Sequence, residues 1–187
     1  GTKDFVSDEI LWSANFTTKS MDIKEAYNKI IDDQKIVSDF FIQKGFKATE
    51  FSFGAIDFQK KFKSVRKEYA DNTSEYEQVF EGYIATQTIT FSAKKNAELM
   101  KKIEAVSNKT SELINSGIEL TSNTIQYTYS ALPSLKQSLI ESATKDANER
   151  ASKIVNTANG KLGKLKRASM GVFQITGQGS TEDDSYG

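Results

Sequence analysis

Apolar residues recur along this chain with two different periods, and the alternation of these periods constrains the fold more than any other feature. Between residues 10 and 16 every second residue is apolar, which is typical of a half-buried strand. From Ile23 to Phe41 apolar residues recur every three or four positions, which predicts a helix with one buried face. Asp22 stands where a helix N-cap is expected, and Gly45 stands where a left-handed residue would end the helix.

The same two patterns return downstream. Residues 51–62 predict a strand with a one-residue shift at Gly54-Ala55, which would keep Phe51, Phe53, Ile56, Phe58 and Phe62 on one face. The charged stretch from Arg66 to Gln78 predicts a surface loop. The later elements are expected to be a strand over 79–91, a helix over 99–113 that ends before Gly117, a strand over 118–129 that shifts register between Leu120 and Ile125, a helix from Pro133 to a stop at Gly160, and a strand over 164–176.

This order, β-α-β-β-α-β-α-β, predicts an α+β domain with a largely antiparallel sheet and helices packed on one face. The first two β-α-β units form a loose internal duplication, since Phe16 and Phe91 end corresponding strands and Gly45 and Gly117 end corresponding helices. We expect a single domain over residues 1–176. The polar, glycine-containing residues 177–187 predict a mobile tail.

The composition excludes several classes of function. The chain has no Cys and no His, which removes thiol nucleophiles, disulfides, Cys/His zinc sites and Ser-His-Asp triads. Its 25 basic residues balance 25 acidic ones, and this argues against a nucleic-acid partner. Adjacent carboxylates at Asp32-Asp33 and Asp183-Asp184 do not converge on one substrate atom, so only a pair from distant elements would support acid-base catalysis. We expect no enzymatic activity, no catalytic residue, no cofactor and no metal site.

Three further features each have a functional and a structural interpretation. Two basic clusters suggest contact with phosphate or an anionic headgroup, although lysines at strand ends also guard an edge against pairing, which we favour. These clusters are Lys60, Lys61, Lys63, Arg66 and Lys67, and then Lys161, Lys164, Lys166 and Arg167. The segment Gly160–Lys164 does not qualify as a phosphate loop because it runs from a helix to a strand. Trp12 and the phenylalanines of the second strand suggest an apolar pocket, but core packing is the more common role of such a stripe.

Short motifs spread over nearly the whole chain resemble those of one family. They are Trp12 in a polar-alternating strand, Ala26-Tyr27, Lys44-Gly45-Phe46, the alanines at four-residue spacing within Ser142–Ala151, Gly160-Lys161-Leu162-Gly163-Lys164-Leu165, and Gly171-Val172-Phe173-Gln174-Ile175. This set resembles the SIMPL-domain family, formerly a domain of unknown function, which includes the YggE-like bacterial periplasmic proteins. The sequence departs from the family pattern at both ends. Members usually have a first strand with a Val-x-Gly motif, of which only Lys3-Asp4-Phe5 matches the trailing end, and a final strand after the polar tail, where this sequence stops at Gly187.

The resemblance implies a bacterial protein of the periplasm or another extracytoplasmic space, behind a signal peptide or an inner-membrane anchor. It also implies self-assembly into a homo-oligomer, a role in envelope or oxidative stress defence, and no enzymatic activity. Because the sequence begins Gly-Thr-Lys-Asp without an initiator Met, we expect a targeting or anchoring segment to precede it.

These considerations lead to two main hypotheses. The first is a non-enzymatic domain that self-assembles through sheet edges or helix faces. The alanines Ala143, Ala147 and Ala151 suit close helix approach, and we expect this face to pack on the domain's own sheet. The alternative is a module that binds an apolar or anionic small molecule between sheet and helices. A carboxylate-based enzyme ranks third.

Overall fold

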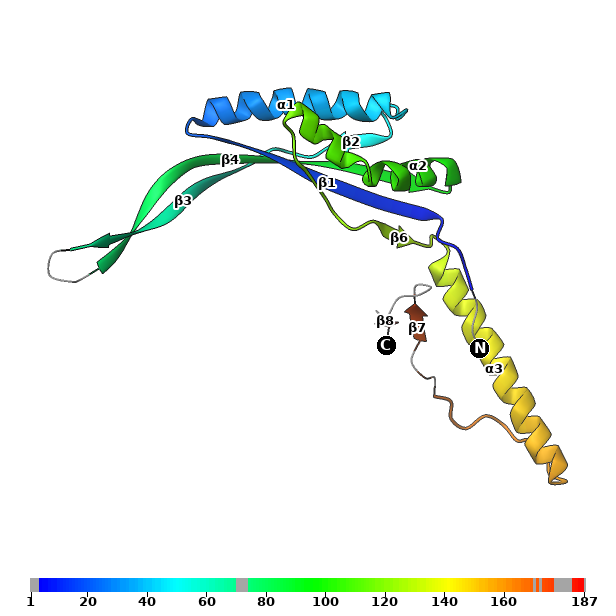
Figure 1. The fold of residues 1–187 in the computed structure, drawn as a ribbon. Helices are drawn as coiled ribbons and strands as arrows, with labels where there is room; N and C mark the ends of the chain where they lie inside the picture. The colour runs from blue at the N-terminus through cyan, green and yellow to red at the C-terminus, as the bar shows by residue number, and fades with distance from the viewer. Residues whose placement is uncertain (1–3, 70–73, 170, 172, 177–182, 187) are drawn as a thin grey trace. The chain divides into compact units, whose positions relative to one another are not determined.

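The computed structural model describes residues 4–69, 74–169, 171, 173–176 and 183–186 (Figure 1). Its elements are, in chain order, β1 (Glu9–Ser20), α1 (Ile23–Gln43), β2 (Phe51–Phe53), β3 (Asp57–Glu68), β4 (Ser74–Lys94), α2 (Ala97–Ser107), the 3₁₀ helix η1 (Thr110–Ser116), β5 (Leu120–Ser122), β6 (Gln126–Thr128), α3 (Leu132–Thr157), β7 (Phe173–Thr176) and β8 (Asp183–Tyr186). The chain forms two compact units. One comprises residues 4–132, and the other comprises the described residues from Pro133 onward.

The first unit contains an antiparallel sheet with the order β2-β4-β1-β5, in which β3 also pairs with β4 and β6 also pairs with β1. Each of the two outer strands is thus split into two pieces. Counting each split strand once, the unit has the β-α-β-β-α-β arrangement of ferredoxin-like domains. The central strands are β1 and β4, one from each β-α-β unit. The outer strand of the first unit, β2 and β3, pairs with β4 of the second unit, and the outer strand of the second unit, β5 and β6, pairs with β1 of the first. The α+β class, the antiparallel sheet and the loose duplication are therefore confirmed.

Both helices α1 and α2 lie on the same face of this sheet (Figure 1). Every second residue of β1 from Ile10 to Phe16 points into the layer between sheet and helices and is buried. The centre of this layer is Phe91, whose ring lies 4.7–5.4 Å from those of Trp12, Phe41, Phe46 and Phe51. Trp12 therefore belongs to the core, and Phe51, Phe53 and Phe58 of the predicted second strand pack against it.

The predicted helix ends of the first unit are confirmed. The Asp22 carboxylate accepts hydrogen bonds from the backbone N–H groups of Lys24 and Glu25, at 2.7 and 3.1 Å, which satisfies two donors that have no partner within the helix. Gly45 has φ +90° and Gly117 has φ +76°, so both occupy the positive-φ conformation expected after a helical segment.

The predicted register shifts of the two outer strands are also confirmed. Across residues 54–56, the paired positions advance by four residues along the outer strand but by only three residues along β4. Across residues 123–125, the paired positions again advance by four residues along the outer strand but by only three along β1. In both places the strand breaks at the shift, so the sequence predicted one bulged strand where the structure has two short ones.

Two predictions in this unit need correction. Most of the loop predicted from Arg66 to Gln78 is strand, because β3 continues to Glu68 and β4 begins at Ser74; residues 70–73 lie outside the described residues. The two strand ends lack an apolar period because both of their faces are exposed, so only the pairing between them defines them as strand. The helix expected over 99–113 is interrupted, since α2 ends at Ser107 and η1 continues as a 3₁₀ helix.

The helix α3 is confirmed, with Pro133 in its first turn. Its stop differs in detail, because Asn159 rather than Gly160 has a positive φ, +56°. The alanine face expected to pack on the sheet is not buried: Ala143 and Ala147 are exposed and Ala151 is half-buried.

The C-terminal segments differ from expectation in two ways. The strand expected over 164–176 is confined to β7, and residues 164–169 have no regular structure. Part of the expected mobile tail, Asp183–Tyr186, forms β8, which pairs antiparallel with β7. The rest of the tail lies outside the described residues, and the predicted domain boundary at residue 176 stays a prediction.

A pair of hydrogen bonds ties the end of the β6 segment to the chain just before β1. The backbone N–H and the hydroxyl of Ser130 donate to the carboxylate of Asp8, at 2.7 and 2.5 Å. Because these bonds favour the charged form, they lower the pKa of Asp8 below its usual value.

This pKa shift predicts a specific dependence of stability on pH. A carboxyl with a lowered folded-state pKa stabilises the fold fully above its unfolded-state pKa of about 3.9, and this contribution is lost as pH falls through the lower folded-state pKa. We expect Asp8→Asn to be less stable than wild type at pH 7, with the difference shrinking toward pH 2. Urea unfolding across this pH range measures it, and a difference that stays constant would contradict the prediction.

Candidate functional site

The β3–β4 hairpin continues beyond the part of the sheet that the helices cover (Figure 1). The pairing of β1 with β4 stops where Ser20 meets Tyr83. Within the described part of the chain, residues 74–82 of β4 therefore pair with β3 alone, and β3 pairs with β4 alone. The hairpin thus has two free edges, one along β3 and one along the first nine residues of β4. These two edges are called the β3 edge and the β4 edge below.

The outer part of the hairpin begins at a β-bulge. The register of β3 against β4 shifts between Lys61 and Phe62, which leaves Glu81 as an extra residue on β4. The next residue, Gly82, has φ +119°. A Cβ atom at Gly82 would lie 2.6 Å from the carbonyl oxygen of Ser20, at the end of β1. Only glycine fits this close approach between the two central strands.

One face of the hairpin carries aromatic side chains. Phe80 lies between Phe62 and Tyr83, with ring centroids 5.7 and 5.2 Å away. Tyr83 packs against the core. These three aromatic side chains therefore extend the core-facing side of the sheet into a region that no described helix covers. Phe62 was expected to be buried with the other phenylalanines of its strand. It is 50% exposed, because it lies past the bulge.

The two edges carry opposite charge. The sequence of β3 has five cations against two anions, whereas residues 74–82 have three glutamates and no cation. Lys67 pairs with Glu77, and Lys61 lies 4.0 Å from Glu81, so the charges attract each other across the hairpin. These pairs are exposed, so each contributes little to stability.

The sequence-predicted basic clusters have different environments. Lys60 and Lys63 of the first cluster lie on the β3 edge and form no ion pair with any described residue. The second cluster, at residues 161–167, is exposed and lies in a stretch without regular structure. The first cluster thus lies on an exposed strand, as expected, whereas the expectation that the second cluster lies at a strand end is wrong.

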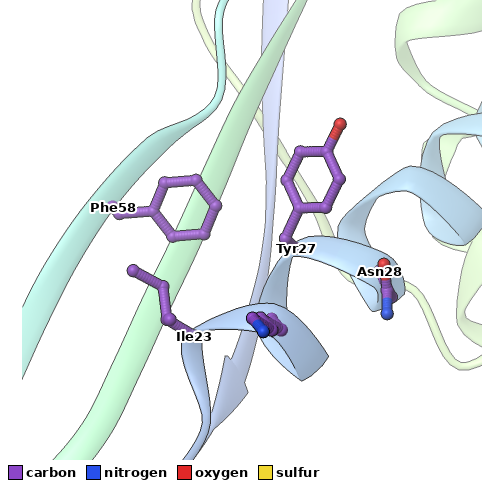
Figure 2. Close-up of a pocket in the computed structure, with 5 residues that line it drawn as sticks. Ile23, Tyr27, Asn28 and Phe58 are labelled. Carbon is purple, nitrogen blue, oxygen red and sulfur yellow. The ribbon is translucent and has the colours of Figure 1, made fainter.

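A shallow apolar hollow lies between the start of α1 and β3 (Figure 2). Its lining residues are Ile23, Lys24, Tyr27, Asn28 and Phe58. Figure 2 shows Ile23 of α1 and Phe58 of β3 pointing toward one another, with Tyr27 beside them, and the rings of Tyr27 and Phe58 are 6.4 Å apart. The side chains of Ile23 and Tyr27 are about half exposed, so the hollow is open to solvent.

The acidic residues singled out in the sequence do not form a site. Asp32 is exposed on α1 and bonds to Lys35 at 3.3 Å, whereas the pKa of its neighbour Asp33 is raised by burial. Asp183 and Asp184 lie on β8. Across the described ranges, no three acidic side chains group closely enough to hold a metal ion. In the same ranges, none of the helices combines the length and the apolar character that a membrane span requires.

The free hairpin edges were missed by the sequence reasoning, which placed a loop at residues 66–78. The signal that would have found them is the charge contrast between the two arms, since lysine and arginine dominate before Tyr69 and glutamate dominates after residue 73. Opposite charges on facing arms are favourable cross-strand pairs.

Comparison with known proteins places the chain in a family. None of the curated proteins matches the sequence. A family model, SIMPL, described as a protein of unknown function (DUF541), matches residues 1–186, which is essentially the whole chain. The chain therefore belongs to the SIMPL family.

Proposed function

We propose that this chain is a non-enzymatic domain that self-assembles into a homo-oligomer outside the cytoplasm. The observation that carries the proposal is the hairpin beyond the bulge, whose two edges have no partner strand within the described part of the chain. A long strand with unpaired backbone N–H and C=O groups is a template for pairing with another chain. Proteins that remain monomeric keep such edges short or cover them.

The aromatic face of the hairpin supports the same proposal. Phe62 and Tyr76 are 50% and 71% exposed, and Phe80 joins Phe62 to the core. Aromatic side chains are enriched in the centres of protein interfaces, where their burial contributes most to affinity. A second copy of the hairpin would supply the missing strand and would place its own aromatic face beside this one.

The cellular part of the proposal has a different basis. The extracytoplasmic location, the anchoring or targeting segment and the role in envelope or oxidative stress defence follow from the resemblance to SIMPL proteins. The absence of cysteine is compatible with an oxidising compartment, because a domain of this size needs no disulfide.

The proposal is tested by the mass of the chain in solution. We expect light scattering on a sizing column to give one discrete species well above the 20.8 kDa of a single chain, over a wide range of concentrations. The same chain should be run beside a longer form that extends at both ends. A monomer in both forms at every concentration would contradict self-assembly.

The second candidate function is binding of an apolar or anionic small molecule. The hollow beside α1 favours it, because two aromatic rings and Ile23 line it together with the polar residues Lys24 and Asn28. A thermal-shift screen of apolar and anionic compounds tests it, with Tyr27→Ala as the matched variant. Shifts of the melting temperature that disappear in this variant would support it, and a screen without shifts would contradict it.

A further inference from the structure

We propose that copies of this chain join head to tail, with the β3 edge of one copy pairing antiparallel with the β4 edge of the next, into a closed ring. This inference rests on the proposed self-assembly and specifies its surface and symmetry. Each free edge thus pairs with another copy of the chain, which contributes its edge of opposite charge.

Charge excludes the two symmetric alternatives. Pairing β3 with β3 would place two strands side by side that each carry five cations and two anions. Pairing the β4 edge with itself would place two segments side by side whose only charged residues are glutamates. Like charges directly opposite one another destabilise a strand pair, whereas opposite charges stabilise it. Only the β3–β4 combination brings a basic edge against an acidic one.

The hairpin itself provides the template for this pairing. Within one chain β3 and β4 already pair antiparallel. Two ion pairs, Lys67 with Glu77 and Lys61 with Glu81, connect the two strands. When two hairpins lie side by side and point the same way, the β3 strand of one lies next to the β4 strand of the other in the same antiparallel sense. The pairing between copies would therefore repeat the pairing within each copy.

This arrangement has rotational symmetry. Each copy uses one edge to contact the preceding copy and the other edge to contact the next, which makes the interface heterologous. A heterologous interface generates a ring when the rotation between copies closes. The single discrete species expected of the proposed self-assembly requires this closure, because an open arrangement would give fibres of varying length.

Unpaired side chains are available for the contact. Among the described residues, Lys60 and Lys63 form no ion pair, and Glu75 accepts a 3.3 Å hydrogen bond from Tyr69 but forms no ion pair. Lys63 lies opposite Val79 and therefore shares a face of the sheet with Glu77 and Glu75. In the ring, Lys63 would meet these glutamates from the neighbouring copy.

Charge reversal on each edge tests the pairing. Lys60→Glu with Lys63→Glu reverses the net charge of β3, and Glu75→Lys with Glu77→Lys reverses that of residues 74–82. Each variant alone then has two edges of like charge, and we expect its association to weaken by about tenfold or more. An equimolar mixture restores opposite charges at every interface, so the oligomer should return with the two variants alternating and an even number of copies.

The outcomes separate the two proposals. Far-UV circular dichroism first establishes that both variants fold. A wild-type chain that stays monomeric contradicts the proposed self-assembly itself. If the wild type is an oligomer and neither variant lowers its mass, the edge pairing is wrong and self-assembly stands. The same holds if the variants dissociate but their mixture does not restore the oligomer.

Cysteine cross-linking gives an independent readout, because the chain contains no cysteine of its own. Ser64 and Gln78 lie opposite one another in the hairpin, so they share one face. A short thiol cross-linker should join a Ser64→Cys chain to a Gln78→Cys chain in a mixture, but should not join two Ser64→Cys chains. Lys35→Cys, on the exposed surface of α1, is the control. Cross-links between two Ser64→Cys chains would overturn the proposal.

Discussion

Phe91→Ala is expected to lower the free energy of unfolding by about 3–5 kcal/mol, the usual cost of removing a fully buried phenylalanine ring. The side chain of Phe91 has no exposed surface, and four aromatic rings surround it. The cavity would open between the central strands and α1, where the backbone of the paired strands restricts collapse. Urea unfolding followed by circular dichroism measures the loss.

Phe62→Ala is the matched control for this prediction. The same side chain is removed, but from the outer hairpin, where half of its surface is already in water. We expect a loss below about 1 kcal/mol, as for most substitutions of exposed residues. Similar losses at both positions would contradict the assignment of the core to the helix-covered part of the sheet. These measurements should be made at a concentration where the chain is dissociated, so that assembly adds no stability.

Gly82→Ala is expected to destabilise the chain by about 3 kcal/mol, near the upper end for one strained backbone position. Two effects act together. The φ of +119° is unfavourable for any residue with a Cβ atom, and this atom would lie 2.6 Å from the Ser20 carbonyl oxygen. Because that oxygen belongs to backbone, either β1 or the bulge must move. The free energy of unfolding in urea measures the effect.

Gly45→Ala separates these two effects. Gly45 also has a positive φ, +90°, but a Cβ atom there would meet nothing within 4 Å. The cost should therefore be backbone strain alone, about 1–2 kcal/mol. Equal costs at the two glycines would show that the approach of Ser20 to Gly82 does not matter.

The lysines of the β3 edge have two compatible roles. Lysine on an exposed strand edge discourages pairing with another copy of the same edge. The same lysines favour pairing with an acidic edge, and residues 74–82 supply one. In the proposed ring, one set of charges would thus exclude the wrong partner and select the right one, which is how specific interfaces discriminate.

The sequence by itself determined the elements whose signal is local. The alternation around Trp12 and the apolar stripe that begins at Ile23 follow from the burial of one face, and the Asp22 cap and Gly45 follow from backbone chemistry at helix ends. Both register shifts could be predicted as well, because a shift leaves a visible change of parity in the apolar pattern. The motifs were also sufficient to indicate the SIMPL family.

Only the tertiary structure decided the features on which the candidate site depends. Residues 66–68 and 74–78 have no buried face and hence no apolar period, so their strand character comes from pairing with one another. The bulge at Glu81 and the need for glycine at position 82 arise where β1 ends against β4, more than sixty residues away in the chain. The β4 edge is free because β1 stops at Ser20 while β4 extends further, and the β3 edge is free because β3 pairs with β4 alone among the described strands. Strand pairing is a contact between distant segments, and a local pattern does not contain it.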